Sequence, residues 1–141
     1  MNLRISGCLD HDGDGVVRYE VKVSGRGFAA TTLCWGDADL MLELGERLAD
    51  FPFGHAGPFH FSIGAERSGT CELEFVRLDA QGHCGVWVSI TGESPVHKSQ
   101  GYERASIFLN VEPAGIDNFV KSLRSYHSRS SKEAFLYEAE A

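Results

Sequence analysis

Apolar and polar residues alternate most regularly between Cys71 and Ile90, where two apolar stretches flank the polar segment D-A-Q-G-H. Alternation with period two places successive side chains on opposite faces of a strand. In the second stretch Val86 and Val88 would face the core, which leaves Trp87 on the other face. The pattern therefore predicts a β-hairpin with one buried face.

The same patterns predict the remaining elements of the chain. Alternation predicts further strands at 3–5, 16–24, 28–35, 59–65 and 104–111. Apolar residues at helical spacing predict helices at 37–51 and 116–127. Asp37 or Asp39 is expected to cap the first helix, and Gly45 within it is expected to permit close packing against a neighbouring element.

Strands in consecutive blocks joined by short turns favour antiparallel pairing. We expect an α+β fold with one mainly antiparallel sheet of about six to seven strands and both helices packed on one face. Residues 1–127 would form a single domain, and residues 128–141 a C-terminal tail. The tail is expected to be weakly ordered, or to pack on the domain or on a second copy, with a short helical turn near Phe135.

Composition narrows the class of protein. The 141 residues carry a formal charge of −7, which argues against a nucleic-acid binder or a protein that binds anionic membranes. No apolar stretch has the length of a signal peptide core or of a membrane span, so we expect a soluble cytoplasmic protein. The four cysteines are expected to be buried free thiols, with a Cys71–Cys84 disulfide as the alternative.

An acidic turn resembles the start of a calcium-binding loop. Asp10, Asp12 and Asp14 precede Gly15 in the order D-x-D-x-D-G, which supplies hard oxygen ligands and a glycine for the sharp turn. The bidentate glutamate expected at the twelfth position is missing, since Glu20 comes one residue early. A solvated acidic turn is therefore the main interpretation, and a calcium or small-ligand site is the alternative.

The other candidate chemistries are incomplete. The segment G-R-G-F-A-A at 25–30 matches a dinucleotide fingerprint, but strand-forming residues follow it where a helix is needed. His55, His60 and His83 match no zinc spacing, and a cleft that contains them is the enzymatic alternative. His83 adjoins Cys84, yet neighbours on a strand point to opposite faces. We predict no cofactor and no metal, and the sequence favours a protein without catalytic activity.

The sheet face opposite the helices is the strongest candidate for a functional surface. Aromatic side chains among charges suit a protein-binding face. The residues expected on it are Trp87, Phe108, Arg18, Lys22, Glu72 and Glu74. The partner would be another protein or a second copy of this chain in a homodimer. The alternative is that the polar segment 91–101 or the tail covers these rings.

The order of elements also resembles a family of small uncharacterised bacterial proteins. The matching pieces are Gly82-His83-Cys84, the strand that ends in Val111-Glu112, and the helix from Ile116 to Leu123. The resemblance covers residues 40–126 and implies an α+β fold without an assigned activity. Some families of this kind lie near toxin–immunity loci, so the resemblance implies an immunity-like binding protein. It carries over no catalytic residue.

Overall fold

The protein forms two antiparallel sheets and two helices. A computed structural model describes residues 2–7, 15–54, 58–64, 68–93, 97, 101–126 and 133–139. Along these residues the elements are β1 (Asn2–Gly7), β2 (Val16–Gly25), β3 (Phe28–Asp37), α1 (Leu40–Leu48), β4 (Phe59–Ile63), β5 (Thr70–Arg77), β6 (Cys84–Thr91), β7 (Arg104–Val111), α2 (Pro113–Arg124) and β8 (Glu133–Tyr137).

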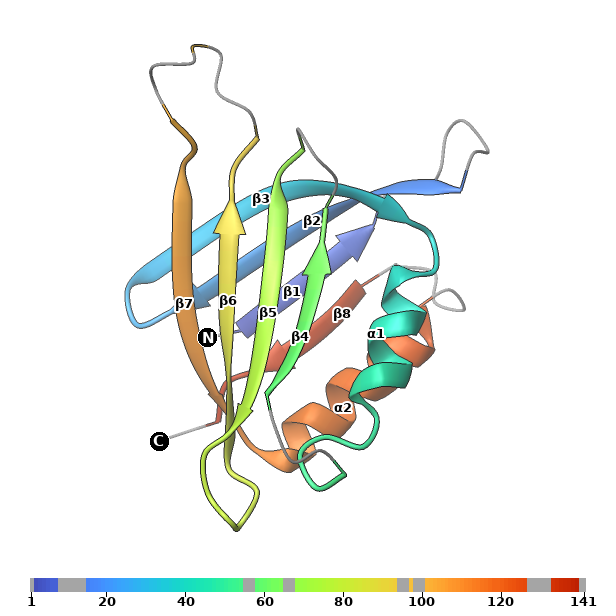
Figure 1. Ribbon diagram of the computed structural model, residues 1–141, viewed down its shortest axis with the longest axis vertical. Coiled ribbons are helices and arrows are strands. Elements are labelled where there is room, and N and C mark those ends of the chain that lie inside the picture. Colours follow the sequence, from blue (N-terminus) through green and yellow to red (C-terminus); the bar gives the residue numbers. More distant parts are fainter. Residues whose placement is uncertain are drawn as a thin grey trace.

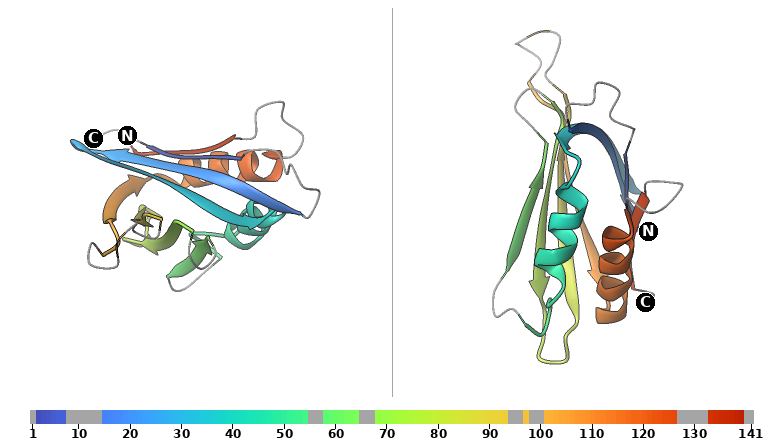
Figure 2. Two further views of the ribbon diagram at one scale, coloured as in Figure 1. Left: turned by 90° about the horizontal axis from the view of Figure 1, so that it is seen from above. Right: turned by 90° about the vertical axis from the view of Figure 1, so that its right-hand side faces the viewer.

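The strands divide into two sheets of four. Sheet A has the order β3-β2-β1-β8, and sheet B has the order β4-β5-β6-β7. In Figure 1 sheet B lies in front of sheet A, and the strands of the two sheets cross at an angle. Figure 2 shows the sheets as separate layers, with the core between them. Each sheet therefore has one face in the core and one outer face.

The predicted α+β class, the antiparallel strands and the central hairpin are confirmed, but the single sheet is wrong. Between β3 and β4 the chain forms α1, and β4 then begins a second sheet instead of extending the first. Period-two alternation shows which side of a strand is buried, and it carries no information on the neighbouring strand. Two separate sheets are therefore compatible with the same pattern of residues.

Both helices lie between the sheets, on the side of β4 and β8, and do not form a layer on one outer face (Figures 1 and 2). α1 contacts α2 and β4, and α2 contacts β8. The predicted role of Gly45 is confirmed, because a Cβ atom there would lie 3.1 Å from the Cβ atom of Leu123 in α2. Asp39 occupies the N-cap position of α1 without a side-chain capping hydrogen bond, contrary to expectation.

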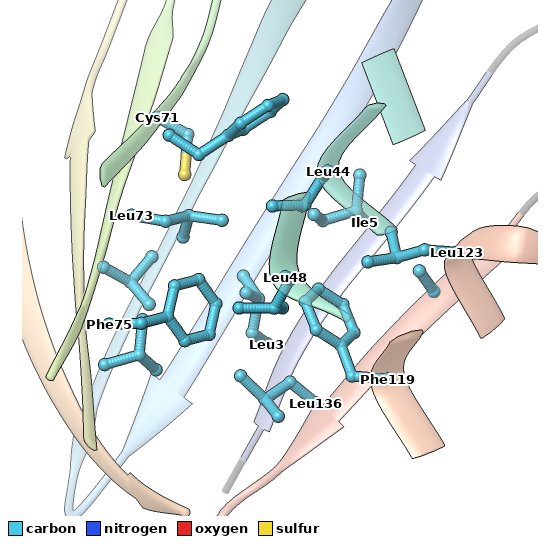
Figure 3. Packing of buried hydrophobic residues seen from close by; sticks show 14 of the residues in the cluster. Leu3, Ile5, Leu44, Leu48, Cys71, Leu73, Phe75, Phe119, Leu123 and Leu136 are labelled. Carbon is cyan, nitrogen blue, oxygen red and sulfur yellow. The ribbon is translucent and has the colours of Figure 1, made fainter. Parts of the chain in front are cut away.

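The core brings together side chains from both sheets and both helices. Figure 3 shows Leu73 and Phe75 from β5 facing Leu48 from α1 and Phe119 from α2. Phe75 is fully buried, and its ring centroid lies 5.9 Å from those of Phe51 and Phe59. Burial of this kind is the main favourable term in folding.

The C-terminal segment belongs to the fold. β8 pairs with β1 in antiparallel register from Asn2 opposite Tyr137 to Ser6 opposite Glu133, so the predicted helical turn is wrong. The amide of Ala139 then donates a hydrogen bond of 2.7 Å to the carbonyl of Asn110 in β7. Residues 133–139 therefore pack on the domain, which is one of the alternatives expected for the tail.

Two further expectations concern the cysteines and the membrane. Cys34, Cys71 and Cys84 are buried free thiols, while Cys8 lies outside the described residues. Cys71 stands opposite Ile90 in the hairpin and Cys84 opposite Arg77, which rules out a bridge between Cys71 and Cys84. No described helix has the length and apolar character needed to cross a membrane.

Candidate functional site on the outer face of sheet B

The outer face of sheet B carries the predicted aromatic residues. Val86 and Val88 are fully buried, and Trp87 between them is 45% exposed. The register of the sheet places Phe108 of β7 directly opposite Trp87, on the same outer face. The predicted outward orientation of Trp87 is therefore confirmed, and Phe108 is half-buried beside it.

One row of residues across the sheet holds both rings. Cross-strand pairs join His60 to Glu74, Glu74 to Trp87, and Trp87 to Phe108. We call these four residues the aromatic rung. The rings of Trp87 and Phe108 are tilted by 57° with their centroids 5.0 Å apart, a geometry typical of favourable aromatic pairs. The next row contains Glu72, and in it the hydroxyls of Ser89 and Ser106 lie 2.9 Å apart.

Gly85 leaves room for the ring of Phe108 in the aromatic rung. A Cβ atom at Gly85 would collide with the Phe108 ring, whose Cε1 and Cε2 atoms would lie 2.8 Å away. The ring of Phe108 therefore packs directly against the backbone of Gly85, beside Trp87. A glycine within a strand pattern indicates such a close approach. That signal was present in the sequence, although only the structure identifies Phe108 as the ring involved.

The predicted surface is divided between the two sheets. Glu72 and Glu74 lie with Trp87 on the outer face of sheet B. Arg18 and Lys22 instead lie on β2 in sheet A, so they cannot share that surface. Their expected place followed from the single-sheet fold, in which every outward side chain would share one face.

The outer face of sheet A has its own aromatic and charged residues. Trp35 is 46% exposed there, and Phe135 and Tyr137 stack with their ring centroids 5.8 Å apart. Arg4 pairs with Glu133 and lies over the Phe135 ring, 5.8 Å from its centroid. The sequence interpretation missed Phe135, Tyr137 and Glu133 because it left 133–137 outside the sheet.

Of the predicted calcium ligands, the structure describes Glu20 alone. Asp10, Asp12 and Asp14 lie outside the described residues, and the calcium site stays a prediction. Glu20 belongs to β2, where its carboxylate lies 3.4 Å from the ammonium of Lys22. Gly15 has a φ of 81°, which is compatible with a sharp turn.

The histidines do not assemble a metal site in the part of the chain that is described. No group of three or more potential ligands occurs there, and His55 is not among the described residues. His60 is exposed on β4, and His83 is exposed in the turn between β5 and β6. The thiol of Cys84 faces the core and donates a hydrogen bond of 3.2 Å to the carbonyl of Val111. Burial raises the pKa of this thiol to about 11, so it is protonated at neutral pH and a poor nucleophile.

His83 is hydrogen-bonded to Asp79 at the tip of the hairpin. Its Nδ1 atom lies 2.6 Å from a carboxylate oxygen of Asp79, and its Nε2 atom lies 3.8 Å from a carboxylate oxygen of Glu112. The amides of Gln81 and His83 also donate hydrogen bonds to Asp79. The hydrogen bond from His83 lowers the pKa of Asp79, and the same bond raises the pKa of His83, with a further contribution from Glu112.

Replacing Asp79 with asparagine is expected to lower the pKa of His83, because the replacement removes both the hydrogen bond to a carboxylate and its negative charge. The wild-type pair stabilises the fold fully between the unfolded pKa values of the carboxyl, about 3.9, and of the histidine, about 6.5. This contribution is lost as the pH rises through the raised folded pKa of His83, and it is lost as the pH falls from about 3.9 through the lowered folded pKa of Asp79. NMR titration of the His83 ring measures the shift.

The control for this titration is Glu103→Gln. Glu103 precedes β7 at the end of sheet B far from the β5–β6 turn (Figure 1), so its replacement should leave the His83 titration unchanged. Equal His83 pKa values in wild-type protein and Asp79→Asn would contradict the observed pairing in solution.

A pocket of about 260 Å³ lies between the start of β3 and the adjoining ends of β6 and β7. Small residues such as Ala30, Gly92 and Ala105 line it, and Glu103 and Arg104 stand at one side. Its volume is below the roughly 300 to 1,000 Å³ of ordinary small-molecule sites. We therefore place the candidate site on the aromatic rung, outside this pocket.

Comparisons with protein-family models, with curated proteins and with solved structures found no match for this chain. The resemblance to a family of small bacterial proteins therefore stays a prediction.

Proposed function

We propose that the protein is a non-enzymatic binding module that recognises a protein partner through the outer face of sheet B. The observation that carries this proposal is the aromatic pair on this face, in which Trp87 is 45% exposed and the half-buried Phe108 packs against Gly85. Tryptophan is among the residues most enriched at the energetic centres of protein interfaces. Two rings that already pack against each other also lose little conformational freedom when a partner covers them.

The surroundings of the rings support this proposal. The outer face of sheet B is a four-stranded surface, with the hydroxyls of Ser89 and Ser106 in the row next to the aromatic rung. An open sheet face suits a protein surface better than it suits a small substrate, which requires a concave site. An immunity-like protein, as the family resemblance implies, would use such a face to bind its partner.

The replacement Trp87→Ala is expected to weaken partner binding by about 30-fold or more, since truncation of a central interface tryptophan costs about 2 kcal/mol or more. The matched control is Trp35→Ala, which removes an equally exposed tryptophan from the outer face of sheet A. Immobilised wild-type protein and both variants would be used to capture and identify bound proteins, and sedimentation would measure self-association.

The proposal expects specific partners, or a second copy, that bind wild-type protein and Trp35→Ala but not Trp87→Ala. Circular dichroism should show that both variants remain folded, because each replaces an exposed side chain. Unchanged capture and unchanged sedimentation in Trp87→Ala would exclude the outer face of sheet B as the binding surface.

A further inference from the structure

We propose that the partner segment bound by the aromatic rung is positively charged, with a lysine or arginine side chain lying against the Trp87 ring. This inference rests on the function proposed above and names the chemistry of the partner. It follows from the charges that surround the rings and from the way in which this fold covers its other exposed aromatic residues.

The two carboxylates beside the rings have no counterion among the described residues. Glu74 stands directly opposite Trp87, and Glu72 lies in the next row of the same strand. Neither carboxylate forms an ion pair with any residue that the structure describes. On sheet A, by contrast, Glu20 pairs with Lys22 and Glu133 pairs with Arg4. The negative charge beside the aromatic rung is therefore available to a partner.

The cations on this face do not reach the rings. Arg104 lies on β7 four residues from Phe108, which corresponds to about 13 Å along an extended strand. His60 lies opposite Glu74 at the far end of the aromatic rung, and β5 separates its strand from that of Trp87. A neutral partner that covered the face would take Glu72 and Glu74 out of water and leave their negative charge uncompensated, which is costly. A basic partner would supply the missing hydrogen bonds and charge.

The fold itself shows the expected contact at other aromatic side chains. Arg47 lies over the ring of Phe59 at 5.1 Å, and Arg77 lies over the ring of Phe53 at 5.6 Å. Within the described residues no cation lies over Trp87, although tryptophan is the strongest acceptor for such contacts. A cation above Trp87 would be attracted both by the ring and by Glu74.

The charge distribution disfavours a second copy as the occupant of this face. The chain carries a formal charge of −7, and two copies that met face to face would bring Glu72 and Glu74 of both molecules into one interface. Like charges that are brought together in an interface cost several kcal/mol. A separate basic protein is therefore the occupant to which we commit.

The test uses the intrinsic fluorescence of Trp87. The chain has two tryptophans, so Trp35→Phe leaves Trp87 as the single reporter. The probes are two short synthetic peptides of equal length, one alternating glycine with lysine and the other alternating glycine with glutamine. We expect a saturable fluorescence change with the lysine peptide, weaker binding at high salt, and no such change with the glutamine peptide.

The carboxylates are tested by Glu72→Gln and Glu74→Gln together in the Trp35→Phe background. Loss of two charge contacts of about 0.5 kcal/mol each should weaken binding of the lysine peptide about fivefold. In the reciprocal variant Trp87→Phe, Trp35 is the reporter and its fluorescence should not respond. No response to the lysine peptide, equal responses to both peptides, or no effect of the double replacement would each overturn the inference.

Failure of this inference can be distinguished from failure of the proposed function. If captured partners depend on Trp87 but bind the Glu72→Gln/Glu74→Gln variant as well as the wild-type protein, the binding face is correct and the basic partner is wrong. If capture is independent of Trp87, the proposed function itself fails. Self-association that depends on Trp87 would identify a second copy as the occupant and would overturn the inference.

Discussion

Replacing Phe75 with alanine is expected to lower the free energy of unfolding by about 3–5 kcal/mol. The Phe75 side chain is fully buried, and the rings of Phe51 and Phe59 pack against it. Its removal leaves a cavity at the place where β4, β5 and the end of α1 meet, and close-packed neighbours can fill that cavity only in part. Urea denaturation of the wild-type protein and of the variant measures the difference.

The control for Phe75→Ala is Phe28→Ala, in which the same ring is removed from a position that is 72% exposed. Its free energy of unfolding should stay within about 0.5 kcal/mol of the wild-type value. Similar losses in the two variants would show that the core between the sheets is not packed as described.

Replacing Leu136 with alanine is expected to lower the free energy of unfolding by about 2–5 kcal/mol. Leu136 is fully buried on the inner face of β8, opposite Leu3 in β1 (Figure 3). The loss should be far larger than that of Tyr137→Ala, which removes the neighbouring side chain from the outer face, where it is 59% exposed. Thermal or urea unfolding of both variants decides the comparison.

The Leu136→Ala experiment also tests the place of β8 in the fold. A weakly ordered C-terminal segment, which was one of the alternatives from the sequence, would tolerate both replacements equally. Equal stabilities of Leu136→Ala and Tyr137→Ala would therefore favour that alternative and contradict the pairing of β8 with β1.

Much of the local structure follows from the residue pattern. The alternation around Trp87 correctly predicted which side chains of β6 face the core, and the spacing of apolar residues correctly predicted both helices. These predictions succeed because each depends only on neighbours within one element. Residues 133–137 were misassigned because five residues are too few to distinguish a strand from a helical turn, and their pairing partner lies at the other end of the chain.

The candidate site could be predicted only in part, because part of it depends on pairing between strands that are distant in the sequence. The outward orientation of Trp87 and Phe108 follows from the alternation within their own strands. Arg18 and Lys22 also point outward, but from the other sheet, and no local pattern indicates to which sheet a strand belongs. The close approach of Phe108 to Gly85 likewise depends on the register of two strands. Pairing between distant segments decides these features.

The adjacency of β1 and β8 has a consequence for the order of folding. Arg4 and Glu133, which pair across these strands, are separated by 129 positions in the sequence. The second edge of β1 therefore stays without a neighbour until residues 133–137 have been synthesised. Contacts between such distant positions slow folding, because a long loop must close before they form. Completion of sheet A is thus a late and slow event, and until then the incomplete edge is exposed to association with other nascent chains.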